Sequence, residues 1–269
     1  MTSPLKLCAD DFGHSGAINQ AILELAGRRR INATTLMVDG AAAEVGAAAI
    51  AGIDGVAVGL HVTLSGEQVP VRSALAPEGR LPHVDALTAR AFAGRLPRDA
   101  IAAEIERQYD RFEQLMGRPP AFVDGHQHVH VLPVIRGIFL EIAHRRAPPA
   151  WVRTCEESLA KIRRRGIFRW TAIRSALLSR GLSARAAGLG LATNRGFAGL
   201  YDFRAGRDYG QLFARWLSEP GPDHLVICHP ARPDPADPLG EARANEYHFL
   251  RDGDLDGLLA ASGLRMGGA

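Results

Sequence analysis

Phe122-Val-Asp-Gly-His-Gln-His-Val-His130 is the stretch of this 269-residue chain that most narrows both its fold and its chemistry. Two apolar residues lead into an acidic residue, and three histidines then follow at alternate positions. Alternate side chains of an extended strand point to one face, so we predict that His126, His128 and His130 share a face at the end of a buried strand. Imidazole is a common metal ligand. The stretch indicates a metal site, with an exposed polar strand end or a satisfied core histidine as the alternative.

Composition describes an ordinary globular protein. The hydrophobic fraction of 46% is ample for a core, and a net charge of +3 is too small to indicate a nucleic-acid partner. Three scattered cysteines without a CxxC pair indicate neither a disulfide framework nor a thiolate zinc site. The first residues lack the features of a signal peptide, and no apolar run reaches the length of a membrane span. We therefore expect a cytoplasmic protein without an integral membrane segment.

Short apolar segments alternate with helical patterns along the chain. We expect strands near residues 5–9, 33–38, 56–64, 122–130, 151–154 and 224–230, helices near 16–28, 41–50, 97–116, 134–145, 208–218 and 254–262, and an irregular excursion over 65–96. This alternation predicts a mostly parallel sheet covered by helices. The fold class that fits best is α/β, a TIM-barrel-like, distorted (β/α) barrel that forms a single domain over residues 1–269.

Polar side chains recur where these strands end. They are Asp10 and Asp11, His61, Asp124 and His126, Arg153, Asn194 and His229. Parallel β/α folds carry their chemistry at the C-terminal ends of strands, so we expect these residues to meet at one edge of the sheet. Taken singly, each has a structural alternative. The two aspartates suit a helix cap or an Asx turn, and a lone histidine is more often a core residue.

Asp11, His61 and His126 together supply one carboxylate and two imidazoles from three strands. Three protein ligands leave coordination positions open, which is typical of a catalytic site for one divalent ion. An ion also relieves the repulsion between two adjacent aspartates, because one ligates while the other, Asp10, stays free as a base. His229, on a distant strand, is then the candidate acid that protonates a leaving group.

Four motifs, in order and spacing along most of the chain, resemble the YdjC/ChbG-like carbohydrate deacetylases. They are Ala9-Asp-Asp-Phe-Gly13, Gly59-Leu-His61, Asp124-Gly-His-Gln-His-Val-His130 and Cys228-His-Pro230. The resemblance implies a TIM-barrel-like fold and hydrolytic removal of N-acetyl groups from amino sugars. The substrates it implies are acetylated chito-oligosaccharides or, in the hopanoid-associated branch, a lipid-linked N-acetylglucosamine. It also implies a homodimer and a divalent ion described as Mg²⁺, although an Asp-His-His set suits Zn²⁺ better.

By position, the resemblance makes Asp11, His61 and His126 the metal ligands, Asp10 the base and His229 the late catalytic histidine. We expect four further polar residues to contact the substrate: His128, His130, Arg153 and Asn194. The sequence departs from the family pattern at Gly125, where serine is usual, and at Thr154-Cys155, where leucine-proline is expected. Residues 155–200 show little similarity to the family pattern, so they leave the sugar specificity open.

Three hypotheses follow from this set of residues. In a metal-dependent N-deacetylase, Asp10 removes a proton from water at the ion and His229 protonates the departing amine. A non-catalytic sugar-binding barrel would keep the ligands but lose the acid or the base, and both are present here. A metal phosphoesterase would need more carboxylates for a two-metal centre. The residues favour the deacetylase.

Residues 161–180 interleave arginines with apolar side chains, which predicts a basic amphipathic helix. A solvated outer helix is the commoner meaning of such a pattern. If its apolar face is exposed near the barrel mouth, the helix fits an anionic membrane and a lipid-linked amino sugar.

Overall fold

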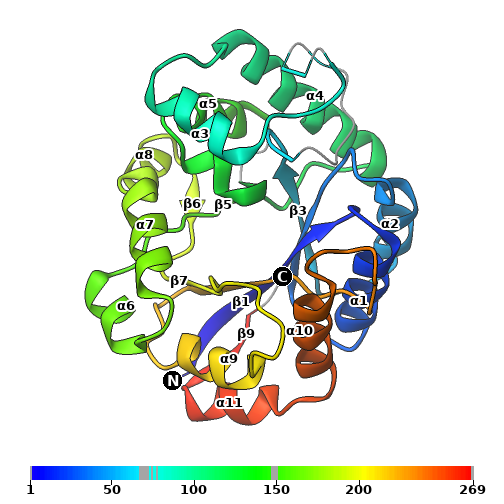
Figure 1. Cartoon of the computed structure of the whole chain (residues 1–269), viewed down its shortest axis with the longest axis vertical. Coiled ribbons are helices and arrows are strands. Elements are labelled where there is room, and N and C mark those ends of the chain that lie inside the picture. The colour runs from blue at the N-terminus through cyan, green and yellow to red at the C-terminus, as the bar shows by residue number, and fades with distance from the viewer. Residues whose placement is uncertain (1, 67–72, 74, 77, 147–150, 268–269) are drawn as a thin grey trace.

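The computed structural model describes residues 2–66, 73, 75–76, 78–146 and 151–267. Within them a parallel sheet runs in the order β6-β5-β4-β3-β2-β1-β8-β7, with β9 paired to β1. Its strands are β1 (Ser3–Phe12), β2 (Ala33–Leu36), β3 (Ala57–Val62), β4 (Phe122–Gly125), β5 (Trp151–Val152), β6 (Ala192–Thr193), β7 (Phe197–Ala198), β8 (His224–Cys228) and β9 (Leu264–Met266). Figure 1 shows these strands curled around a common centre with the helices outside. The predicted α/β, barrel-like architecture is confirmed.

The helices follow the strands in alternation. They are α1 (Gly16–Gly27), α2 (Ala43–Ile50), α3 (Val84–Phe92), α4 (Arg98–Met116), α5 (Ile135–Arg146), α6 (Leu159–Arg165), α7 (Arg169–Ser179), α8 (Leu182–Gly188), α9 (Tyr209–Leu217), α10 (Gly240–Asp252) and α11 (Leu255–Ala261). The excursion predicted over 65–96 lies partly outside the described residues, and its described part contains α3. In the described part of the chain, no helix is both long and apolar enough to cross a bilayer.

Helix α4 illustrates how local sequence and packing agree. Ile101, Ile105, Tyr109 and Phe112 recur at helical spacing and are buried on one face. Gly117 ends the helix in the left-handed conformation (φ 66°), where its N–H donates to the carbonyl of Glu113 at 2.8 Å. Glycine adopts this conformation without a Cβ penalty. The boundaries predicted from sequence are confirmed.

The two end strands of the curled sheet are consecutive in the chain. β6 pairs with β5 and β7 pairs with β8, and only residues 194–196 separate β6 from β7. The Asn194 carboxamide bridges this step: its oxygen accepts from the Thr154 amide at 2.8 Å, and its nitrogen donates to the carbonyls of Thr154 and Gly196 at 3.0 Å. One run of chain, residues 192–198, therefore connects the two sides of the sheet.

The histidine stretch does not form one long strand, and that prediction is wrong. β4 ends at Gly125, and a 3₁₀ turn, η1 (His126–Val131), follows at once. Gln127 and His128 adopt left-handed backbone angles (φ 52° and 58°), so the chain folds back on itself. A Cβ at Gly125 would lie 3.1 Å from the amide nitrogen of His130, a spacing that favours glycine over serine. His126, His128 and His130 consequently point in different directions.

Residues 161–180 form two short helices, so the prediction of one basic amphipathic helix over this stretch is wrong. Gly166, at φ 77°, ends α6, and α7 begins after Phe168. Ile167 and Phe168 pack against the core, whereas Trp170 (84% exposed) and Leu177 (55% exposed) project from α7. Helix α10 and strand β9 were not anticipated from the sequence.

His224 provides a test of burial in this fold. It is fully buried at the start of β8, and burial lowers its pKa to about 3, with the Arg165 guanidinium adding to the effect. Because the unfolded chain binds a proton at higher pH than the folded chain, stability is lost as pH falls from ~6.5 towards ~3, by ~1.4 kcal/mol per pH unit.

We therefore expect His224→Gln to flatten the acid side of the stability curve. Urea unfolding at several pH values between 4 and 8 measures the free energy of unfolding directly. His144→Gln, at an exposed position on α5, is the matched control. Equal slopes for His224→Gln and wild type would contradict the assignment.

Candidate metal centre and catalytic site

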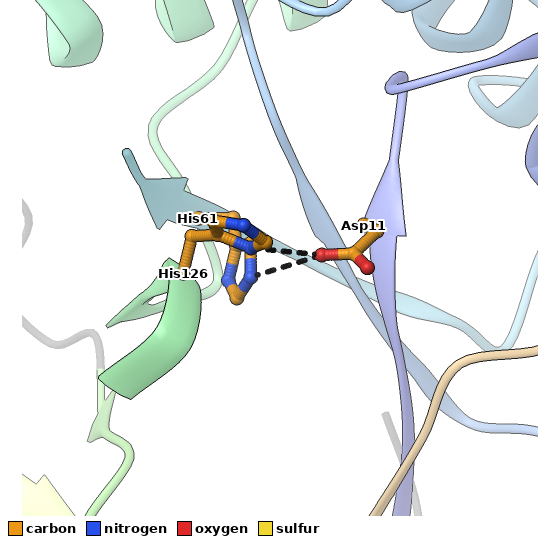
Figure 2. Close-up of side chains that lie close together, drawn as sticks. All are labelled: Asp11, His61 and His126. Carbon is orange, nitrogen blue, oxygen red and sulfur yellow. Dashed lines mark hydrogen bonds and ion pairs between the residues drawn. The ribbon is translucent and has the colours of Figure 1, made fainter. Parts of the chain in front are cut away.

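The structure brings Asp11, His61 and His126 together from the C-terminal ends of β1 and β3 and from the first residue of η1 (Figure 2). Asp11 Oδ1 lies 3.0 Å from His126 Nδ1 and 3.5 Å from His61 Nε2. One ligand atom from each residue lies within 4.8 Å of the others. Asp11 reaches this position with a left-handed backbone (φ 67°), which aspartate tolerates better than most residues.

The spacing of the donor atoms suits a single divalent ion. Bonds of about 2.1 Å in a tetrahedral site place neighbouring ligand atoms about 3.4 Å apart. An octahedral site with similar bonds places them about 3.0 Å apart. The two measured distances, 3.0 and 3.5 Å, bracket these values. The residues present therefore fit an ion, and two imidazoles with one carboxylate are a donor set that favours Zn²⁺ over Mg²⁺.

Two partners orient the candidate ligands. Asp124 Oδ1 lies 2.6 Å from His61 Nδ1, so the carboxylate accepts the Nδ1 proton and Nε2 faces Asp11. This carboxylate–histidine pairing is typical of metal sites. Arg243 donates to Asp11 Oδ2 at 2.7 Å, which leaves Oδ1 for the two imidazoles. Although burial lowers the pKa of His61, Asp124 and Asp11 raise it to about 10, so an ion must displace the Nε2 proton.

Asp10 lies behind this set in a buried ion pair. Arg153, on which no surface is exposed, donates to the two Asp10 oxygens at 2.6 and 2.5 Å, and Thr35 donates to Oδ1 at 3.2 Å. Burial raises the pKa of Asp10, but the Arg153 charge outweighs it and lowers the pKa below its usual value. Arg153 also lies 2.7 Å from Asp124 Oδ2. Asp10 is therefore ionised at neutral pH.

His229 follows the last residue of β8 and faces Asp10. Its Nε2 lies 3.8 Å from Asp10 Oδ2, and its ring packs edge-on against Phe203 with the ring centroids 5.0 Å apart. Burial lowers the pKa of His229 to about 4, so the ring is neutral at pH 7. The ring becomes an acid only after it accepts a proton. The structure thus places the predicted base and the predicted acid next to each other.

Of the four residues predicted to contact substrate, three are buried in supporting positions. His130 is fully buried, packs on Phe139, and its Nε2 donates to the Arg153 carbonyl at 3.1 Å. Arg153 binds the buried carboxylates, and the Asn194 carboxamide is used in the step from β6 to β7. All three side chains are engaged by other groups of the protein, and their contact with a substrate stays a prediction. His128 lines a cavity between α3 and α7, and Asn194 lines a separate cavity of about 700 Å³ beside α6 and α7.

Two cavities adjoin the site and share Gln127 in their walls. One, of about 330 Å³, reaches Asp11 and His126 and is bordered by His14, His83 and Asp237. The other, of about 490 Å³, lies between α3 and α7 over His128. Its apolar lining comprises Val84, Phe92, Val131, Leu132, Leu178 and Leu200.

Sequence reasoning missed three residues of the site. Asp124 was noted at a strand end, but nothing in the sequence identified it as the partner of His61 Nδ1. Arg243 and Glu246 come from α10, which was not predicted. Burial raises the pKa of Glu246 to about 7, with the Tyr201 hydroxyl and the His229 amide opposing the shift. Arg243 and Glu246 are three residues apart, which places them on the same face of a helix, but this spacing is informative only once α10 is known.

Comparisons with known proteins show which family this chain belongs to. A family model described as "YdjC-like protein" matches residues 4–261. The chitooligosaccharide deacetylase of Escherichia fergusonii is 31% identical over 265 residues, which cover 94% of this chain and 90% of that protein. The carbohydrate deacetylase of Mus musculus is 38% identical over 143 residues, 51% of this chain but only 46% of the mouse protein.

A solved structure shares the fold. The crystal structure of an Enterococcus faecalis V583 protein, named for cellobiose-phosphate cleavage, covers 100% of this chain and 98% of its own with a TM-score of 0.71. Its sequence identity is 20%, so the likeness concerns the fold alone.

We predict that the purified protein binds one divalent ion through Asp11, His61 and His126. His126→Ala removes one of three ligands and should release the ion, as measured by elemental analysis after dialysis. Asp124→Asn keeps all three ligands but weakens the hold on His61, so we expect about 10–100-fold lower affinity. His144→Ala is the control, because His144 is an exposed histidine on α5 and is not one of the candidate ligands. An unchanged ion content in His126→Ala would contradict the assignment.

Proposed function

Because this chain belongs to the YdjC-like family, we propose that it is a metal-dependent hydrolase that removes the acetyl group from an N-acetylated amino sugar. The observation that carries the proposal is the convergence of Asp11, His61 and His126, with Asp10 and His229 paired beside them. Two relatives are named as deacetylases of carbohydrates. The Escherichia fergusonii protein matches 94% of this chain, and the Mus musculus protein matches 51% of it.

The proposed reaction is hydrolysis of an amide. Asp11, His61 and His126 would hold the ion, which would supply Lewis acidity towards the amide oxygen and would lower the pKa of nearby water. Asp10, ionised and fixed by Arg153, takes the proton from the attacking water. His229 is within 3.8 Å of Asp10, so that proton can pass to its ring and then to the departing amine. The products are acetate and a free amino sugar.

The alternative is a sugar-binding barrel without turnover. It would keep the cavity and the ion ligands but has no use for a buried Asp10–His229 pair, whose desolvation is costly. Both residues are present, and Arg153 neutralises Asp10 within the barrel. This pairing favours catalysis over binding alone.

A lipid-linked amino sugar is a second candidate substrate, beside soluble chito-oligosaccharides. The 490 Å³ cavity next to the site has an apolar part, formed by six of its lining side chains, beside polar ones such as Asp85 and Arg174. Helix α7, which forms one wall of it, exposes Trp170, Arg174 and Leu177 along one face. Residues 158–200 contain nine cations and no acidic residue. An apolar cavity beside a basic surface with an exposed tryptophan suits a lipid anchored in an anionic bilayer. The homodimer and the cytoplasmic location stay predictions.

The role of Asp10 is tested by Asp10→Asn. The variant also loses one of the two counter-ions of Arg153, but asparagine is isosteric and Asp124 remains paired with Arg153, so the ion and the circular dichroism spectrum should be kept. It should lose about 10²–10⁴-fold in kcat, because the base is removed. Asp223→Asn makes the same change in an ion pair with Lys6 at the opposite end of β8, and it should leave kcat unaltered. A loss of less than roughly threefold in Asp10→Asn would remove Asp10 from this role, since general bases contribute far more.

Substrate choice is tested by acetate release from chitobiose, longer chito-oligomers and an N-acetylglucosamine glycolipid, together with vesicle co-sedimentation at two salt concentrations. If the lipid-linked substrate is correct, the glycolipid is the best substrate and anionic vesicles retain the protein at low salt. Trp170→Ala should weaken that retention. Rapid turnover of chitobiose without vesicle binding would favour the soluble sugar instead.

A further inference from the structure

We propose that Arg243 and Glu246, one turn apart on α10, are positioning residues that fix the backbone of His229 for proton transfer. The inference rests on the proposed function, in which His229 carries the proton to the amine. Arg243 also borders the cavity that reaches Asp11 and His126, whereas Glu246 is fully buried and lines no part of it. Glu246 therefore acts through His229 rather than on the substrate, and the test is made at Glu246.

Both polar groups of the His229 peptide backbone are bound by this pair. Glu246 Oε2 accepts the His229 N–H at 2.5 Å, and Arg243 Nη1 donates to the His229 carbonyl at 3.4 Å. Arg243 also donates to Asp11 Oδ2 at 2.7 Å. One turn of α10 therefore links the backbone of the candidate acid to a candidate metal ligand on β1.

The position of His229 in the sheet explains why it needs such support. The pairing of β8 with β1 ends at Cys228 opposite Ala9, so His229 lies beyond the ladder. Pro230 follows and has no N–H, so the chain gains no further donor there. A buried amide without a partner is costly, and the carboxylate of Glu246 supplies the acceptor that the sheet does not.

The His229 ring itself has little else to fix it. Its Nδ1 is buried and has no hydrogen-bond partner among the described residues, and Phe203 contacts the ring only by packing. The 3.8 Å separation between Nε2 and Asp10 thus depends on where the backbone lies. Glu246 is in turn held by the Tyr201 hydroxyl, which donates to Oε1 at 2.6 Å.

Glu246→Ala tests the proposal. We expect kcat to fall roughly 10–100-fold, the loss typical of a small displacement of a catalytic group, while KM and ion content stay within threefold of wild type. Glu246→Gln keeps one oxygen for the His229 amide, and its NH₂ can donate to the Tyr201 oxygen, so it should restore most of kcat. Residue-resolved amide exchange should show faster exchange at His229 in Glu246→Ala and near-normal exchange in Glu246→Gln.

Glu156→Ala is the matched control, because Glu156 likewise accepts backbone amides, those of Leu182 and Ser183, away from the site. It should lower the melting temperature without changing kcat. If Glu246→Ala lowers kcat only as far as Glu156→Ala does, or if Glu246→Gln rescues nothing, the positioning role is overturned. If the wild type releases no acetate, the proposed function fails, and the exchange rate at His229 still decides whether Glu246 holds its amide.

Discussion

The buried charge network around Arg153 is the interaction on which the rest of the site depends. This guanidinium has no exposed surface and is balanced by two carboxylates, Asp10 and Asp124. Asp124 in turn fixes His61, so a single cation determines the positions of the candidate base and of a candidate ligand. Removing one partner of a buried pair leaves an uncompensated charge, at a cost of about 3–5 kcal/mol. Arg153, Asp10 and Asp124 therefore compensate the burial of one another's charge.

Much of the site follows from strand-end reasoning. We expect Asp11, His61 and His126 to meet because they lie at the C-terminal ends of three predicted parallel strands, and the fold brings them together. The local conformation of the histidine stretch was beyond such reasoning. Gln127 and His128 adopt left-handed backbone angles, which the strand-like pattern of alternating histidines does not indicate.

Helix α10 escaped prediction for a reason connected with its role. Its buried face includes Arg243 and Glu246 among small or mixed residues such as Ala242 and Ala244, so the apolar stripe that normally identifies a helix is weak. His130 and Arg153 were also difficult to assign from the sequence. Both are polar and follow predicted strands, but their side chains are fully buried. A sequence shows which residues are polar, but it does not show whether a polar side chain pairs with another buried charge or faces a cavity.

The seam at residues 192–198 has a consequence for how this scaffold can diversify. Residues 192–198 pair with β5 on one side and with β8 on the other, and the Asn194 carboxamide supplies hydrogen bonds between the two pairings. Strand pairing therefore continues from β5 to β8 without any contribution from α6, α7 and α8. Those three helices lie in the chain between β5 and β6 and contact the sheet through side chains, as where Arg165 donates to the Phe197 carbonyl at 2.9 Å. Their length and surface can change while the register of the strands that carry the ion ligands is preserved, so selectivity for the distal part of a sugar derivative can evolve separately from the chemistry.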